Sequence, residues 1–313
     1  MDRLECMRAF VAVADAAGFA AAARRLGVSP PVVTRALASL EDHVGAQLLT
    51  RTTRKVRLTE VGARYLEDCR RLLSELEDIE NAVSGNWSEP RGSLAVTAPV
   101  MFGRLYVTPI LLDYLAQHPQ VTARVLLNDR IVDLIDEGLD LAVRIAKLSD
   151  SALTALRVGE VRRVVCASPA FLRKHGVPRV PQDLVELDAI VFGPERSVPS
   201  WHFEGPKGRV SVRPRARAVT NAAEVGIQAA VGGRGVTRVL SYMIAADLRA
   251  DRLRVVLEDY EPEPIPIHLV YRDSRRAPAR VRAFLDFASQ RLRADLSINP
   301  RKRRGSVGAR SEA

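Results

Sequence analysis

At 313 residues the chain is too long for one small domain, which predicts two or three domains. The formal net charge of +10 favours a polyanionic partner, although a basic run at residues 301–304 adds to the charge without marking a site. Membrane and disulfide-rich secreted classes are excluded, because no run of about eighteen apolar residues and no signal-peptide pattern is present, and the three cysteines are widely spaced (Cys6, Cys69 and Cys166). We therefore expect a cytoplasmic protein.

A glycine and two adjacent prolines interrupt the alanine- and leucine-rich stretch at residues 20–41. Proline in a helix interior costs about 3 kcal/mol relative to alanine, whereas the first turn of a helix tolerates it. One helix is therefore expected to end near Leu26, with Gly27 in the turn and a second helix starting at Pro30. Ser29 is the expected N-cap, its hydroxyl accepting a hydrogen bond from an exposed N–H group. Two short helices joined in this way form a helix-turn-helix.

Residue spacing indicates which side of this pair is buried. An upstream stripe at three- and four-residue spacing predicts a third helix that completes the core: Leu4, Met7, Phe10 and Val11. In the pair itself the residues expected to point inward are Leu26, Val28, Val33 and Leu37. The outward residues of the second helix are small or basic, which suits a helix in the major groove of DNA. An alanine-rich helical hairpin with a solvated face is the alternative.

The following segment, residues 45–59, predicts two short extended strands around a turn. Four basic residues lie close together there: Arg51, Arg54, Lys55 and Arg57. A basic hairpin beside a helix-turn-helix is a wing, which contacts phosphates or enters the minor groove. The candidate DNA-contacting residues are therefore Ser29, Pro30, Pro31, Thr34, Arg35, Arg51, Arg54 and Lys55.

Residues 22–62 resemble the DNA-binding region of LysR-type transcriptional regulators, in the branch similar to CrgA. The resemblance rests on the pair Leu40–Glu41, on the G-x-x-L-L-x-R step at residues 45–51, and on RTTRxVxLTExG at residues 51–62. It implies a DNA-binding regulator that controls promoter activity in response to a small-molecule effector. This sequence departs from the family at two positions, with Pro30 in place of the usual glutamine and Thr34 in place of the usual serine.

A long charged helix is predicted from Glu60 to about Val83, with Thr59 before it. Its apolar residues alternate spacings of four and three, which is a heptad seam that requires a partner helix. The seam residues are Tyr65, Cys69, Leu72, Leu76, Ile79 and Val83. No second heptad helix is evident in the chain, so the partner is expected to be another copy, as the family's linker helix implies. A packing face within one chain is the alternative.

Beyond residue 90 short apolar strands alternate with helices, which predicts an α/β architecture with a parallel sheet and helices on both faces. The resemblance implies a two-lobed effector domain similar to type 2 periplasmic binding proteins. The expected domains are a winged helix-turn-helix (1–60), a linker helix for dimerisation (61–90), an effector-binding domain (91–295) and a disordered basic tail (296–313). Within the effector domain, lobe 1 comprises about 91–162 and 266–295, and lobe 2 about 163–265.

Ligands of such sheets bind at the carboxyl ends of the strands, between the lobes. The candidate effector-binding residues at these positions are Ala98, Pro99, Val100, Asn128, Arg144, Ile145, Phe192, Trp201 and Asn221. We expect Asn221 to cap a helix starting at Ala222, whose free N–H groups attract an anion. Arg144 is either an anion ligand or a structural ion-pair partner, and Trp201 either covers the ligand or lies in the core.

The sequence gives little support for a catalytic function. The five histidines lack metal-ligand spacing, no G-x-S-x-G elbow is present, and the GGRG stretch at residues 232–235 lacks the lysine of a phosphate loop. We predict a non-enzymatic protein without a cofactor or metal. Its expected partners are promoter DNA, an effector that is a small organic anion, its own copies in a homodimer or homotetramer, and RNA polymerase. A DNA-tethered enzyme and a solute-binding protein are the disfavoured alternatives.

Overall fold

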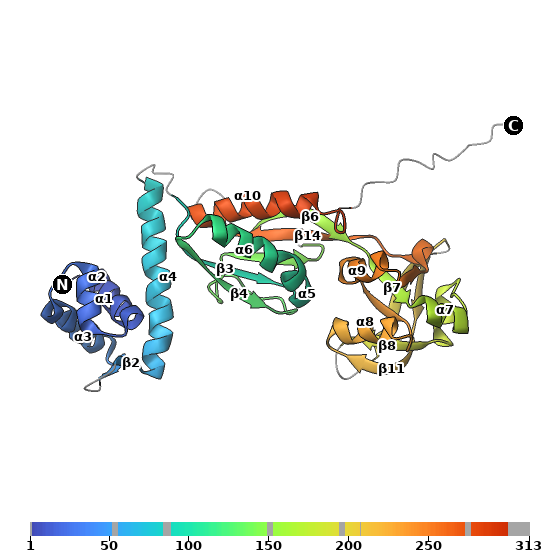
Figure 1. Ribbon diagram of the computed structural model, residues 1–313, viewed down its shortest axis with the longest axis horizontal. Coiled ribbons are helices and arrows are strands. Elements are labelled where there is room, and N and C mark those ends of the chain that lie inside the picture. Colours follow the sequence, from blue (N-terminus) through green and yellow to red (C-terminus); the bar gives the residue numbers. More distant parts are fainter. Residues whose placement is uncertain are drawn as a thin grey trace. The chain divides into compact units, whose positions relative to one another are not determined.

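The computed structural model describes residues 2–51, 56–83, 89–148, 153–193, 198–206, 208–272 and 277–299. The chain divides into two compact units (Figure 1). Unit 1 comprises Met1–Ser93 with Pro278–Arg280, and unit 2 comprises Leu94–Ala277 with Val281–Ala313. Within the described ranges, every helix is too short or too polar to cross a membrane.

Unit 1 contains the predicted helix-turn-helix. Its elements are α1 (Arg3–Ala16), α2 (Phe19–Leu26), α3 (Pro30–Val44), β1 (Leu49–Arg51), β2 (Val56–Leu58) and α4 (Glu60–Val83). The turn after α2 depends on Gly27, whose φ of +67° lies in the left-handed region that favours glycine. There the Val28 N–H donates to the carbonyl oxygen of Ala23 at 3.1 Å, which satisfies one of the free carbonyls at the end of α2. The predicted limits of the two helices are confirmed.

The core of unit 1 lies between α1, α3 and the first half of α4. Phe10 of α1 and Leu37 of α3 are fully buried, and each such side chain contributes about 2 kcal/mol of burial energy. Two residues expected to point inward do not, since Leu26 is 37% exposed and Val28 is 41% exposed. Both flank Gly27, where the chain reverses, so no neighbouring element covers them.

Lobe 1 of unit 2 is built on a five-stranded sheet, in the order β4-β3-β5-β14-β6. These strands are β3 (Gly92–Ala98), β4 (Val121–Leu127), β5 (Leu141–Ile145), β6 (Thr154–Val161) and β14 (Ile265–Tyr271). β3 runs parallel to β5, but β14 is antiparallel to both β5 and β6. The sheet is therefore mixed and not purely parallel as expected, because β14 is a single strand that returns from the second lobe.

Helices cover one face of this sheet. The chain continues from β3 into α5 (Val100–Phe102), the π-helix η1 (Gly103–Val107) and α6 (Thr108–Gln117), and α10 (Ala279–Ala294) follows β14. Figure 1 shows α6 and α10 lying along the sheet. Their buried residues, such as Tyr114 and Phe284, form one core with Val143 of β5. The neighbouring Ala142 points to the other face, where Val132 and other residues of the loop after β4 form a smaller cluster.

Lobe 2 consists of short strands and helices. Its strands are β7 (Arg163–Ala167), β8 (Asp188–Phe192), β9 (Trp201–Gly205), β10 (Gly208–Val212), β11 (Arg215–Thr220), β12 (Thr237–Leu240) and β13 (Arg254–Val256). They pair as β12-β7-β13, as β11 parallel to β8, and as the β9–β10 hairpin. Between them lie α7 (Pro169–His175), η2 (Pro181–Val185), α8 (Ala223–Val231), η3 (Ser241–Ile244), α9 (Ala245–Arg249) and η4 (Glu258–Tyr260).

The predicted disordered tail begins too early. Ile298 is fully buried, and its carbonyl oxygen accepts a hydrogen bond from the Glu160 N–H at 2.9 Å. The Asn299 amide donates to the carbonyl oxygen of Val158 at 3.0 Å. The prediction was wrong for residues 296–299, because the buried side chain of Ile298 and these two hydrogen bonds anchor the segment against β6. Residues 300–313 lie outside the described ranges.

Candidate nucleic-acid interface and ligand site

The first turn of α3 presents an exposed surface with two prolines in it. Ser29, Pro30 and Pro31 are all exposed, and the two prolines have no N–H group. Ser29 is the N-cap in an extended conformation (φ −79°, ψ 148°), but its hydroxyl makes no capping hydrogen bond. The predicted bond is wrong because the Val32 N–H donates to the backbone carbonyl of Ser29 instead, at 3.0 Å. The Ser29 hydroxyl is therefore available to an external partner.

The next turn of α3 adds one occupied and one free polar group. The Thr34 hydroxyl donates to the carbonyl oxygen of Pro30 at 3.1 Å, which leaves its oxygen as an acceptor. Arg35 is exposed, and its guanidinium makes no hydrogen bond or ion pair within the part of the chain that the structure describes. All five donors of Arg35 are thus available, which is what bidentate contact with guanine requires.

Glu41 fixes the wing to the end of α3. Its Oε1 accepts hydrogen bonds from the Leu48 N–H at 2.8 Å and the Leu49 N–H at 3.1 Å. These donors stand just before and at the start of β1, so a charged acceptor on α3 positions the first wing strand. Sequence reasoning assigned this glutamate no role, although its pairing with Leu40 marked it as part of the motif.

The start of α4 holds the wing from its other side. The Thr59 hydroxyl donates to the carbonyl oxygen of Gln47 at 2.8 Å and accepts from the Gly62 N–H at 2.8 Å. A Cβ atom at Gly62 would lie 1.9 Å from the carbonyl oxygen of Leu48, so only glycine allows this approach. β1 and β2 pair with Thr50 opposite Arg57, which is exposed.

The outer part of the predicted wing contact lies beyond what is described. Arg54 and Lys55 fall outside the described ranges, as does the side chain of Arg51. Of the eight predicted DNA-contacting residues, the structure therefore places five, all on the first two turns of α3 or at its cap.

The predicted dimer seam on α4 is divided. Cys69 is fully buried in the core of unit 1, and the Tyr65 ring lies 6.0 Å from the ring of Phe10. The prediction was wrong at Cys69, because a heptad pattern does not tell whether the partner helix belongs to another copy or, as here, to α1 of the same chain. Tyr65 is half-buried, and its place in the dimer seam stays a prediction. Burial raises the pKa of the Cys69 thiol.

The rest of the seam is only partly described. Leu72 is 42% exposed and Leu76 is half-buried. The side chains of Ile79 and Val83 lie outside the described residues.

Four of the predicted effector-binding residues come together at the ends of β3 and β4. The Asn128 N–H donates to the carbonyl oxygen of Ala98, and the Val100 N–H, just after Pro99, donates to Oδ1 of Asp129, both at 3.1 Å. The Asn128 side-chain oxygen is buried and has no hydrogen-bond partner among the described residues. Asp129, which sequence reasoning missed, thus occupies the backbone donor of Val100, one of the predicted effector-binding residues.

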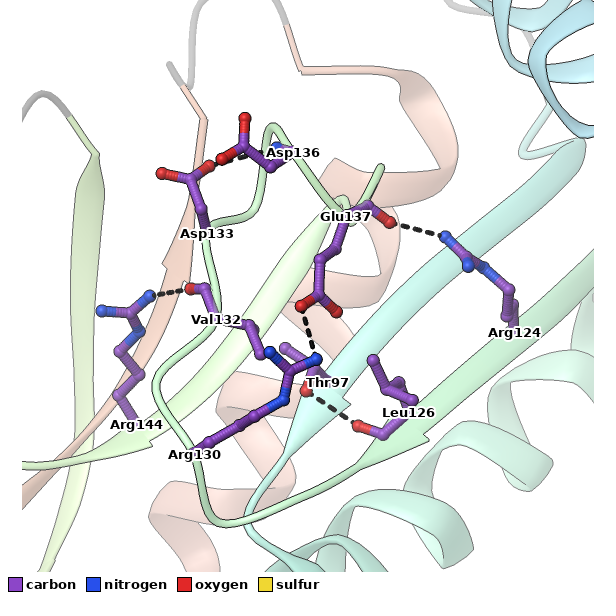
Figure 2. A network of polar contacts seen from close by, with 9 residues as sticks. All are labelled: Thr97, Arg124, Leu126, Arg130, Val132, Asp133, Asp136, Glu137 and Arg144. Carbon is purple, nitrogen blue, oxygen red and sulfur yellow. Dashed lines mark hydrogen bonds and ion pairs between the residues drawn. The ribbon is translucent and has the colours of Figure 1, made fainter.

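Arg144 is held by the loop after β4, as Figure 2 shows. Its guanidinium donates to the carbonyl oxygen of Val132 at 2.7 Å, and the side chain is half-buried. The bond is to a carbonyl and not to a carboxylate, so neither the anion site nor the structural ion pair is shown. Ile145 is half-buried beside it and pairs with Ile267 of β14.

Other arginines hold the same loop. Arg124 donates to the carbonyl oxygen of Glu137 at 3.0 Å, and Arg130 pairs with the Glu137 carboxylate at 2.6 Å (Figure 2). Arg124 also donates to the carbonyl oxygen of Gly138 at 2.9 Å. The Asp133 carboxylate accepts from the Ile135 N–H at 2.7 Å. The loop is therefore ordered by charged side chains on its borders.

The predicted residues of lobe 2 have separate surroundings. Trp201 is 4% exposed and lies in the core of lobe 2, which agrees with the core alternative. Phe192 is 37% exposed at the end of β8. Asn221 is exposed and does not cap α8, which begins at Ala223 with Ala222 at the N-cap. The capping prediction was wrong because the Thr220 hydroxyl accepts the Ala222 N–H at 3.1 Å and ends the strand first.

The two lobes meet through other residues. Arg104 of η1 pairs with Glu224 of α8 at 3.2 Å. The ring of Phe102 lies 5.2 Å from that of Tyr242, edge to face. Among the described residues, no hydrogen bond or ion pair joins the strand ends of lobe 1 to Phe192, Trp201 or Asn221.

Comparisons with known proteins agree over both units. Residues 4–63 match the family model of bacterial regulatory helix-turn-helix proteins of the lysR family, and residues 88–293 match the LysR substrate binding domain. An HTH-type transcriptional repressor of Pseudomonas aeruginosa is 31% identical, over 93% of this chain and 92% of the relative. The regulator DmlR of Escherichia coli is 33% identical, over 92% of this chain and 94% of the relative. The structure of CrgA, a LysR-type regulator from Neisseria meningitidis, aligns with a TM-score of 0.59 and 26% identity, over 92% of this chain and 98% of that one.

Proposed function

This chain belongs to the LysR family of transcriptional regulators, and we propose that it controls promoters as a homodimer or homotetramer that responds to a small organic anion. The family consists of DNA-binding regulators with an effector-binding domain, which implies a non-enzymatic role. The alternatives, a DNA-tethered enzyme and a solute-binding protein, gain no support from the relatives. Contact with RNA polymerase and a place in the cytoplasm are part of the proposal.

The observation that carries the DNA-binding part is the exposed guanidinium of Arg35 on α3, which has no partner among the residues that the structure describes. We expect Arg35 to contact a base edge in the major groove, with the Ser29 hydroxyl and the Thr34 oxygen beside it. Pro30 and Pro31 offer only apolar surface, which suits contact with a thymine methyl group. Arg51, Arg54 and Lys55 of the wing are expected to contact phosphates or the minor groove.

Titration of operator DNA at several salt concentrations tests this assignment. Arg35→Ala is expected to cost about 1–3 kcal/mol on the proper site and to relax sequence preference, whereas Arg54→Ala weakens binding on all sequences and lowers the salt slope. Arg64→Ala, at an exposed position on α4 that pairs with Glu60, is the control and leaves binding unchanged. Unchanged affinity in both Arg35→Ala and Arg54→Ala would contradict the interface.

The dimer proposal rests on the exposed part of α4. Leu72 is a large apolar side chain that the core of its own unit leaves 42% exposed. Leu72→Glu would place a charge in the helix pair, which is unfavourable unless the helices separate. Light scattering is expected to show loss of the oligomer together with loss of operator binding, while Arg64→Glu on the same helix changes neither. A fully oligomeric Leu72→Glu protein would refute the contact.

The effector proposal rests on the donors of Arg144 that Val132 leaves unused. Arg124 is a matched control, because it holds the same loop through backbone carbonyls and lies outside the predicted site. With benzoate as the probe, Arg144→Ala is expected to lower affinity at least about tenfold, the loss of one charge-assisted hydrogen bond. Arg124→Ala is expected to bind benzoate normally. Equal losses in the two variants would mean that Arg144 acts only on the loop.

A further inference from the structure

One carboxylate in unit 1 joins three helices. Asp15 lies near the end of α1, and its Oδ2 accepts a hydrogen bond from the Arg25 guanidinium of α2 at 3.3 Å. Its Oδ1 accepts a hydrogen bond from the Arg70 guanidinium of α4. The Asp15 side chain is 27% exposed, which is less than either arginine side chain. A single acidic group therefore links the first helix of the helix-turn-helix to the helix of the proposed dimer contact.

The position of Asp15 in α1 is electrostatically unfavourable without these partners. α1 ends at Ala16, so Asp15 stands in its last turn, where the free carbonyl groups carry partial negative charge. That turn contains no basic residue of its own. The cations that offset the charge of Asp15 come instead from α2 and α4, 10 and 55 residues further along the chain. A residue that goes against the local preference of its helix indicates a role in the contact between helices.

Asp15 marks the point where α4 leaves the core of unit 1. The rings of Phe10 and Tyr65 lie 6.0 Å apart, and five residues further along both helices Asp15 accepts from Arg70. α1 then ends, whereas α4 continues. Among the residues that the structure describes, Leu73 is the last of α4 to pack against this core, and α4 extends beyond it for about 15 Å. A small rotation of α4 at Asp15 therefore becomes a larger displacement at its far end.

We propose that Asp15 is a positioning residue, which sets the angle between the helix-turn-helix and α4 and thereby the spacing of the two half-sites that a dimer binds. The inference rests on the proposed function, in which two copies pair through the exposed part of α4. In such a dimer the separation of the two α3 helices depends on the angle at which α4 leaves each copy. Helix-turn-helix dimers bind half-sites whose spacing matches the separation of their recognition helices. Asp15 needs no contact with DNA in this role.

Binding to DNA of altered spacing tests the role of Asp15. The probes are duplexes that the native chain selects from a random-sequence pool, the same duplexes with one base pair inserted between the half-sites, and a single half-site. The insertion moves the second half-site by about 3.4 Å and rotates it by about a tenth of a turn, so the native chain is expected to bind more weakly. In Asp15→Ala this penalty is expected to shrink about three- to fivefold, since a partly exposed ion-pair network contributes no more than this factor.

Arg70→Ala separates geometry from charge. It breaks the bond between α1 and α4, but it changes the net charge in the opposite direction from Asp15→Ala, and with it the general attraction to phosphates. Both variants are nevertheless expected to tolerate the inserted base pair equally, and the double variant no more than either alone. Asp68→Ala is the matched control, because it changes the charge as Asp15→Ala does but removes an ion pair within α4, with Arg71 at 3.0 Å. It is expected to keep the native penalty.

The single half-site separates positioning from folding. Asp15→Ala is expected to bind it as tightly as Asp68→Ala, because the exposed surface of α3 is unchanged. A loss on the single half-site as large as that on the selected duplex would mean that Asp15 only supports the fold of unit 1. Equal insertion penalties in the native chain, Asp15→Ala and Arg70→Ala would also overturn the inference. A native chain that selects no duplex would instead refute the DNA-binding function on which the inference rests.

Discussion

The DNA-binding end of unit 1 and the predicted ligand site of unit 2 differ in how far their contacts reach along the chain. In unit 1, Glu41 accepts from the Leu48 N–H, which is 7 residues away, and Thr59 accepts from the Gly62 N–H, which is 3 residues away. In unit 2, the Val100 N–H donates to Asp129, which is 29 residues away. Contacts of the first kind leave a motif in the sequence, whereas contacts of the second kind do not.

The largest effect is expected at the closest local contact, that of Gly62 with the backbone of Leu48. The Cβ atom of Gly62→Ala would lie 1.9 Å from the Leu48 carbonyl oxygen and 2.8 Å from its carbonyl carbon. Neither atom can rotate away, so α4 must shift from β1, at an expected cost of about 3 kcal/mol. Urea unfolding followed by circular dichroism measures the loss, and operator binding is expected to fall with it.

Gly45→Ala is the control for this substitution. Gly45 has a φ of +71° and no atom within 4 Å of an added Cβ, so its cost of about 1–2 kcal/mol comes from backbone strain alone. A Gly62→Ala protein as stable as Gly45→Ala would show that the wing tolerates separation from α4.

Sequence reasoning was most successful where partners are near neighbours. The ends of α2 and α3 followed from Gly27, Pro30 and Pro31, because each residue type restricts its own backbone. It failed where a side chain had a choice of partner. The Ser29 hydroxyl was expected to accept a hydrogen bond at the start of α3, but the backbone carbonyl of Ser29 accepts it instead. Cys69 was expected to face a second copy of the chain, but it packs in one core with α1.

The second prediction concerns the two hydrogen bonds from β1 to Glu41. Glu41→Ala leaves the part-buried N–H groups of Leu48 and Leu49 without their charged acceptor, which is expected to cost about 2 kcal/mol. Hydrogen exchange is expected to accelerate at these two amides, and operator affinity to fall as the wing loosens. Asp42→Ala, the exposed neighbour on α3, serves as the control. Unchanged exchange at Leu48 would remove Glu41 from the wing.

The effector domain was predicted less completely, for a physical reason. Its strand ends were identified, but which side chain meets which depends on loops and strands far away in sequence. Arg144 donates to Val132 in a loop that carried no motif, and Asp129 occupies the Val100 N–H.

A third prediction tests the loop after β4, where the contacts join residues at intermediate separations along the chain. Arg124→Ala removes hydrogen bonds to two backbone carbonyls, 13 and 14 residues away, and is expected to cost about 1 kcal/mol. Arg130→Ala removes only an exposed ion pair with Glu137, which is expected to contribute well under about 1 kcal/mol. Hydrogen exchange of residues 133–139 measures both. Faster exchange in Arg130→Ala than in Arg124→Ala would reverse this ranking.

The smallest expected effect concerns His268 on the central strand β14. This residue lies opposite Arg144 of β5 and opposite Arg157 of β6. Residues paired directly across strands share one face of the sheet, so the side chains of Arg144, His268 and Arg157 project from the same face. Burial, and then the charge of Arg157, lower the pKa of His268 from 6.5, against a hydrogen bond with the backbone of Ala146 that raises it.

Because the folded chain holds this proton less tightly than the unfolded chain, His268 destabilises unit 2 only in acid. The loss of stability begins as the pH falls below 6.5, where the unfolded chain takes up the proton, and it is complete below the lowered pKa of the folded chain. Thermal unfolding at neutral and at mildly acidic pH, followed by tryptophan fluorescence, is expected to show a smaller difference in Tm for His268→Gln than for the native chain. His43→Gln, at an exposed position of unit 1, is expected to leave the difference in place.

A carboxylate bound beside Arg144 would offset the positive charge around His268, so saturating benzoate is also expected to reduce the acid loss of stability in the native chain. Equal losses of stability in acid for His268→Gln and the native chain would contradict this prediction. The pairing of His268 with Arg144 and Arg157 across the strands would then have no effect on how the stability of unit 2 depends on pH.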